Sequence, residues 1–176
     1  MSHKPFVVFG AVLLCAALSL AQEAKYRTQK GVLLPDPSVT KGAVRLRSKT
    51  TVCSIKWGLD ERHVTPKMKE QAFAEYGTAQ GEGVCALKTH TGTKGQAVKE
   101  GCEVDHLISR ELGGADTLDN LWPQPYTQHP GAHEKDWLEN ELHKEVCHGD
   151  ITLADAQQEI KTDWYAAYCK RKSCTN

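Results

Sequence analysis

The sequence lacks several features that mark whole classes of protein. It carries 22 basic and 22 acidic side chains, so no excess of positive charge holds it to nucleic acid as in a histone. It has no repeat, low-complexity tract or Pro/Ser-rich linker, while apolar residues make up 40% of the chain. These properties exclude collagen-like and wholly disordered architectures and favour one globular domain.

Only one long apolar run occurs, from Phe6 to Leu20. It is shorter than the ~20 apolar residues of a spanning helix, it follows Lys4, and it ends in small residues. This pattern predicts a signal peptide over residues 1–21, with a membrane anchor and a lipoprotein at Cys15 as lesser alternatives. We therefore expect a secreted or periplasmic protein that has no membrane attachment after cleavage.

The chain also lacks any Cys-x-x-Cys pair, which argues against a structural zinc site. Removal of residues 1–21 leaves six cysteines, and an even set in an exported chain predicts three disulfides. The spacing alone leaves the connectivity open. The pairing we favour joins Cys85 to Cys102, Cys169 to Cys174 and Cys53 to Cys147.

Local patterns predict an α+β fold with the order helix, strand, strand, helix, helix. Residues 22–50 show no sustained periodicity and are predicted to be an extended arm, with one domain over residues 51–176. The predicted elements are a helix from Thr65-Pro66 to Gly77, a glycine-rich loop or loose hairpin over 77–101, strands over 103–108 and 120–123 with the second ended by Pro123, a helix from Pro130-Gly131 to Gly149, and a helix from Thr152.

One stretch groups side chains that can perform acid–base or metal chemistry: Asp105, His106, Asn120, His129 and His133. Adjacent strand residues face opposite sides, so Asp105 and His106 can serve different roles. A turn between the strands would return Asn120 to His106, and a helix across the hairpin would present the later histidines. Taken singly, each residue also has a purely structural explanation.

These residues carry a resemblance to a known family. Asp-His followed by Glu-Leu-Gly-Gly, then Asn120 fourteen residues after His106, then histidines nine and thirteen residues after Asn120, resemble the HNH (ββα-metal) nuclease motif. The segments VDHLISRELGG, NLWPQP and AHEKDWLENELHKEVC are similar to those of exported bacterial HNH-like proteins. The resemblance implies a ββα-metal core of hairpin plus helix, with flanking helices and disulfides.

The resemblance also implies a function and roles. His106 would be the general base, oriented by Asn120, in a metal-dependent endonuclease that hydrolyses phosphodiester bonds in DNA. Asp105 would bind a divalent metal together with His133, in the first turn of the helix, and His129, which Pro130 restricts to the cap position at best. Asp105 with one histidine suits Mg²⁺, and two histidines would also accept Zn²⁺, Mn²⁺ or Ni²⁺. The alternative is a non-catalytic exported protein that uses the scaffold for binding or structure.

Charge is distributed unevenly along the chain. Residues 41–69 contain eight basic and two acidic side chains, whereas residues 100–160 contain fourteen acidic and three basic ones. An acidic site repels phosphate, so we expect the basic segment to pack beside the hairpin and guide the nucleic acid. Lys135, Asp136, Glu139 and His143 are expected on the solvated face of their helix. The sequence does not define the oligomeric state.

Overall fold

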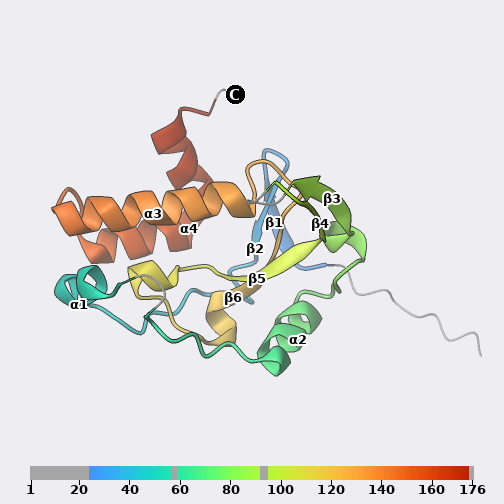
Figure 1. Ribbon diagram of the computed structural model, residues 1–176, viewed down its shortest axis with the longest axis horizontal. Coiled ribbons are helices and arrows are strands. Elements are labelled where there is room, and N and C mark those ends of the chain that lie inside the picture. Colours follow the sequence, from blue (N-terminus) through green and yellow to red (C-terminus); the bar gives the residue numbers. More distant parts are fainter. Residues whose placement is uncertain (1–23, 57–58, 92–94, 175–176) are drawn as a thin grey trace, which may run out of the picture.

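The computed structural model describes residues 24–56, 59–91 and 95–174 and has the predicted α+β architecture (Figure 1). The predicted signal peptide lies outside these residues. Three antiparallel hairpins and four helices follow one another along the chain: β1 (Tyr26–Gln29), β2 (Val32–Pro35), α1 (Lys49–Ser54), α2 (Pro66–Glu75), β3 (Lys88–Thr91), β4 (Ala97–Glu100), β5 (Cys102–His106), β6 (Leu121–Pro125), α3 (Ala132–His148) and α4 (Leu153–Lys172). No helix in this described part is long and apolar enough to cross a bilayer.

The hairpin of β5 and β6 carries the predicted site residues. Asp105 lies opposite Trp122 and His106 opposite Leu121. The prediction that Pro123 ends the second strand is wrong, because β6 continues to Pro125. The Leu107 N–H donates to the Asn120 carbonyl oxygen. From this pair onward, hydrogen-bonded and non-hydrogen-bonded residue pairs alternate along the two strands. Both prolines therefore fall at positions whose nitrogen faces away from β5 and costs no hydrogen bond.

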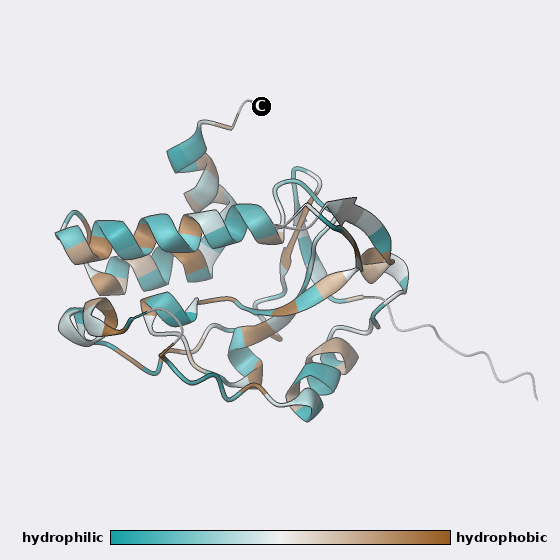
Figure 2. Ribbon diagram, in the orientation of Figure 1, coloured by the Kyte–Doolittle hydropathy of each residue, from teal (hydrophilic) through white to brown (hydrophobic). Residues whose placement is uncertain are grey.

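Helices α3 and α4 lie side by side, with α1 beneath the C-terminal end of α3 (Figure 1). Their apolar positions form interrupted stripes among hydrophilic ones, and these stripes build the core (Figure 2). The predicted helix boundaries are confirmed by their caps. Thr65 accepts a hydrogen bond from the Met68 amide, and Thr152 accepts one from the Asp155 amide. At the end of α3, Gly149 adopts a φ of 98°, a left-handed conformation that suits glycine.

The prediction of an extended arm over residues 22–50 is wrong for its first half. Strands β1 and β2 form a hairpin, and Val32 and Leu34 are buried in the main core. The Tyr26 hydroxyl donates to the Pro123 carbonyl at 2.9 Å, which fixes this hairpin against β6. The short strand segments have too few residues for periodicity to show, and tertiary burial decides their structure.

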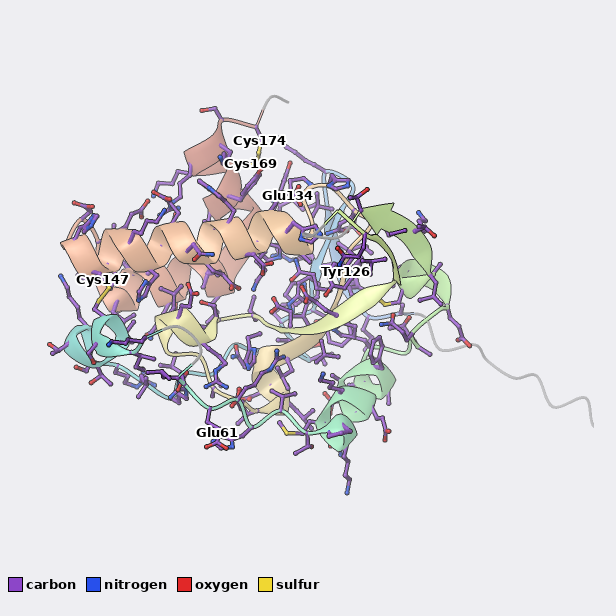
Figure 3. The ribbon with its side chains drawn as sticks, in the orientation of Figure 1. Glu61, Tyr126, Glu134, Cys147, Cys169 and Cys174 are labelled. Carbon is purple, nitrogen blue, oxygen red and sulfur yellow. A yellow bond between two sulfur atoms is a disulfide. The ribbon has the colours of Figure 1, made fainter. Side chains whose placement is uncertain are left out.

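All three predicted disulfides are present. One joins Cys53 of α1 to Cys147 of α3 across 94 positions, and a second joins Cys85 to Cys102 beside the hairpin of β3 and β4. The third is the C-terminal disulfide between the residues labelled at the top of Figure 3, Cys169 and Cys174. Three disulfides indicate an oxidising environment.

Candidate functional site

His106 is almost fully buried at the end of β5, and its ring is held by a carboxylate. Its Nε2 atom lies 2.7 Å from Oδ1 of Asp116, which follows the glycine pair of the 107–120 connection. A carboxylate partner makes Nε2 the protonated nitrogen of the neutral ring, which leaves the lone pair on Nδ1. Nδ1 forms no hydrogen bond with any described residue, so its lone pair is not engaged by the part of the chain that the structure describes.

The surroundings of His106 keep the ring neutral near pH 7. Burial lowers its pKa below the usual 6.5, although Asp105 and the hydrogen bond with Asp116 act in the opposite direction. The positive charge of Arg62 lowers the pKa further. A neutral imidazole whose Nδ1 lone pair is not engaged by a hydrogen bond can accept a proton from a water molecule that reaches it, which is the requirement for a general base.

Asn120 is fully buried and fixes the connection that contains Asp116. Its Oδ1 accepts from the Ile108 amide at 2.9 Å and from the Ala43 amide at 3.3 Å. Its Nδ2 donates to the carbonyls of Ile108 and Ala115, each at 3.0 Å. Asn120 therefore holds the backbone immediately after His106, and it forms no hydrogen bond with the His106 ring.

Asp105 faces helix α3, where it meets a buried lysine. Lys135 Nζ donates to Asp105 Oδ2 at 2.7 Å and to the His106 carbonyl oxygen at 2.6 Å, and it also donates to Glu139 Oε1. The Lys135 side chain is 0% exposed, so the expectation that it lies on a solvated helix face is wrong. Burial lowers its pKa, but Asp105 and Glu139 outweigh burial and the net pKa is raised, which keeps the ammonium charged.

The structure does not bring the two predicted histidine ligands to Asp105. His129 precedes α3, is 74% exposed and pairs with Glu134 at 3.3 Å. His133 is exposed on the first turn of α3, where its ring lies 5.8 Å from that of Tyr126. Successive helical residues are about 100° apart, so His133 points about 200° away from Lys135, the residue that faces the hairpin. Figure 3 shows Tyr126 and Glu134 at this end of the helix.

A divalent metal does not fit the predicted ligand set in this geometry. Within the described residues, the one group of three potential ligand atoms lying within 4.8 Å of one another is Cys53, His143 and Cys147. The two cysteines of that group form a disulfide. Asp105, His129 and His133 do not converge, and the ammonium of Lys135 already contacts the Asp105 carboxylate.

Acidic side chains lie near Asp105, and burial, with a smaller contribution from the Asp105 charge, raises the pKa values of Glu103 and Asp136. Burial raises the pKa of Glu103 to about 7, and Asp105 adds to this effect although the Tyr126 hydroxyl donates to Glu103 at 2.7 Å. Burial and Asp105 also raise the pKa of Asp136 on α3. The hairpin face that carries Asp105 is therefore acidic, in agreement with the charge distribution of the sequence.

The basic segment packs beside the hairpin, as predicted. Arg62 donates to the Val104 carbonyl at 3.0 Å, and the His63 amide donates to Asp116 at 2.7 Å. Arg110 bridges this segment to the site, because its guanidinium contacts Asp116 and Asp60. A cavity of about 540 Å³ adjoins these residues, and it is lined by Val52, Ile55, Asp60, Arg62, Arg110, Glu111, Asn140 and His143.

Sequence reasoning missed Asp116 and misplaced Lys135. Asp116 directly follows Gly113-Gly114-Ala115, and a glycine pair soon after a strand signals a reversal that can return the next acid to the strand end. Lys135 lies three residues before Leu138 in the apolar stripe, a spacing that places it on the buried face. Both signals were present, but neither shows which partner a residue meets.

Comparisons with known proteins add no assignment: no family model matches the chain, and neither the curated proteins nor the solved structures contain a significant match.

Proposed function

We propose that this protein hydrolyses phosphodiester bonds in DNA, as an HNH-type endonuclease, with His106 as the general base. The observation that carries the proposal is the contact between His106 Nε2 and Asp116, which leaves Nδ1 as the acceptor atom. The hairpin of β5 and β6, followed by α3, supports the proposal because it has the chain order of a ββα core.

The reaction requires one water and one proton acceptor. Nδ1 of His106 takes a proton from water while the water oxygen forms a bond to phosphorus. The bond from phosphorus to the leaving oxygen then breaks, and that oxygen takes a proton from solvent. The products are one phosphomonoester and one hydroxyl end. Asp116 stabilises the imidazolium that forms, as a carboxylate partner does in other histidine-dependent hydrolases.

Arg62 is the side chain best placed to attract the phosphate. It is exposed, lines the cavity beside the site, and its charge acts on His106. Arg110 has a different role, because Asp60 and Asp116 already neutralise its guanidinium. We therefore assign phosphate contact to Arg62 and support of Asp116 to Arg110. The positive charge of Arg62 then offsets the negative charge of the hairpin face that carries Asp105.

A plasmid-nicking assay tests the proposal. The wild-type protein is compared with His106→Ala in the presence of chelator and of added Mg²⁺, Mn²⁺, Zn²⁺ or Ni²⁺. His148→Ala is the matched control, since His148 is exposed at the far end of α3. Nicking by wild type and control but not by His106→Ala supports the proposal. Equal activity of wild type and His106→Ala under every condition refutes it, and an RNA substrate run in parallel defines the nucleic acid.

The second candidate function is a non-catalytic exported protein that uses this scaffold for binding. Lys135 favours it, because a buried ammonium holds the Asp105 carboxylate that the resemblance assigns to a metal. The absence of cleavage in the nicking assay, together with DNA binding that Arg62→Ala weakens, would favour this candidate.

We also propose that the chain is exported and that residues 1–21 are removed. The three disulfides support this proposal, since they persist in oxidising compartments. Intact-mass measurement of the protein recovered outside the cytoplasm should give a chain that begins at Gln22. A chain that retains Met1 would contradict it.

A further inference from the structure

The Lys135 ammonium is surrounded by three oxygen atoms from two elements. Two lie on β5, namely Asp105 Oδ2 and the His106 carbonyl oxygen, and the third is Glu139 Oε1 on α3. An ammonium has three donors, so these three acceptors saturate it. A fully buried lysine is rare unless it is paired in this way.

Carboxylate and carbonyl oxygens are also the ligands of hard divalent cations. The ammonium and a divalent ion would therefore compete for the same oxygens. We infer that Lys135 is a built-in cation: its ammonium takes the place of a metal ion at Asp105, and the site works without one. The metal-free activity in this inference rests on the proposed function, whereas the exclusion of metal from Asp105 does not.

Lys135 acts as a positioning residue in this arrangement. Because its side chain is 0% exposed, it does not reach a phosphate in solvent. It holds the carbonyl of His106 and the neighbouring carboxylate, and so ties the end of β5 to α3 beneath the general base. It also supplies a positive charge beside the partly buried Asp105 carboxylate.

Mn²⁺ binding, followed by the electron paramagnetic resonance signal of the free ion, tests the exclusion directly. The variant Lys135→Ala removes the ammonium and leaves the oxygens, so it should bind Mn²⁺ about tenfold or more tightly than wild type. Asp105→Asn added to Lys135→Ala should abolish the gain. Lys144→Ala is the matched control, because Lys144 is exposed on the same helix and its ion pair among the described residues is with Glu141. It should behave as wild type does.

The outcomes separate this role from a merely structural one. Loss of a structural contact would lower stability without creating a Mn²⁺ site. The inference is overturned if wild type binds Mn²⁺ and Asp105→Asn abolishes that binding, or if folded Lys135→Ala gains no binding. Tryptophan fluorescence shows whether Lys135→Ala folds. If it does not, Mn²⁺ binding by wild type is compared with that by Asp105→Asn. Equal binding supports the inference, and weaker binding by Asp105→Asn overturns it.

Cleavage in chelator separates the inference from the proposed function. Plasmid nicking by wild type that persists in chelator supports both. Nicking that requires added metal overturns the inference and leaves the proposed function standing. If wild type cleaves under no condition, the proposed function fails, and the exclusion of metal from Asp105 is then judged on Mn²⁺ binding alone.

Discussion

Replacement of Asn120 by alanine should destabilise the protein strongly, although Asn120 is expected to touch no substrate. The side chain makes four hydrogen bonds to backbone groups of three residues, and it is fully buried. Alanine fills little of the space and offers neither donor nor acceptor. Water does not reach the vacated partners easily, so they lose their bonds without full replacement.

The loss can be estimated from these bonds. A neutral hydrogen bond contributes about 1 kcal/mol net. The bond from Ala43 is the longest, at 3.3 Å, and counts for less than the others. We therefore expect Asn120→Ala to lower the free energy of unfolding by about 3–4 kcal/mol. This is a large part of the about 5–15 kcal/mol that stabilises a typical domain.

Urea unfolding followed by tryptophan fluorescence measures this loss, because Trp122 and Trp164 are buried in the core. The matched control is Asn140→Ala. Asn140 is exposed on α3, and its side chain donates a hydrogen bond to the Asp136 carbonyl of the same helix, so its replacement should leave the urea midpoint nearly unchanged. A loss of less than about 1 kcal/mol in Asn120→Ala, with an unchanged urea dependence, would refute the role that we assign to Asn120.

Three further predictions concern the base, the disulfides and the glycine pair. The His106 pKa, measured by NMR titration, should lie below 6.5 and fall further in Asp116→Asn; because the unfolded chain binds the proton more tightly, stability should decrease as pH falls through 6.5. An unshifted or raised pKa would contradict this. Serine replacement of the disulfide between α1 and α3 should cost about 4–5 kcal/mol, against about 2 kcal/mol for the C-terminal disulfide, whose cysteines are only 5 positions apart. The reverse order in thermal unfolding would argue against the loop-entropy explanation. Gly114→Ala should not fold, since a Cβ there would lie 1.8 Å from the Ile108 carbonyl oxygen, and a native circular dichroism spectrum would disprove that expectation.

Capping and cysteine patterns predicted much of the fold because they act locally. Thr65 with Pro66, and Thr152 with Asp155, mark helix starts that the structure keeps. The favoured disulfide pairing closes two short loops and joins the two remaining cysteines, and the structure contains it, although the spacing alone left the connectivity open. The hairpin of β1 and β2 was not predictable in the same way, since four-residue strands depend on what they pack against.

The candidate site was predicted in part. The sequence did not define the rotation of α3 about its axis, which decides which helix residue faces Asp105. Asp105, His106 and Asn120 lie on or beside one hairpin, so their proximity followed from the spacing. The helix residue that meets Asp105 depends on where α3 begins, and a shift of two residues turns the facing side by about 200°. The start at Ala132 places Lys135 at the hairpin and directs His133 to solvent.

The N-terminal hairpin has a consequence for the order in which the chain acquires its structure. β1 and β2 leave the ribosome early, yet the residues that they contact are synthesised much later. Hydrogen bonds join the Tyr26 hydroxyl to Pro123, the Leu33 amide to Gln128, and the Arg27 guanidinium to Thr162. These contacts span 95 to 135 positions of the sequence. A growing chain therefore cannot close its core until α4 has been made, and contacts of such long range also slow folding. The N-terminal hairpin therefore gains these partners only after most of the chain has been synthesised.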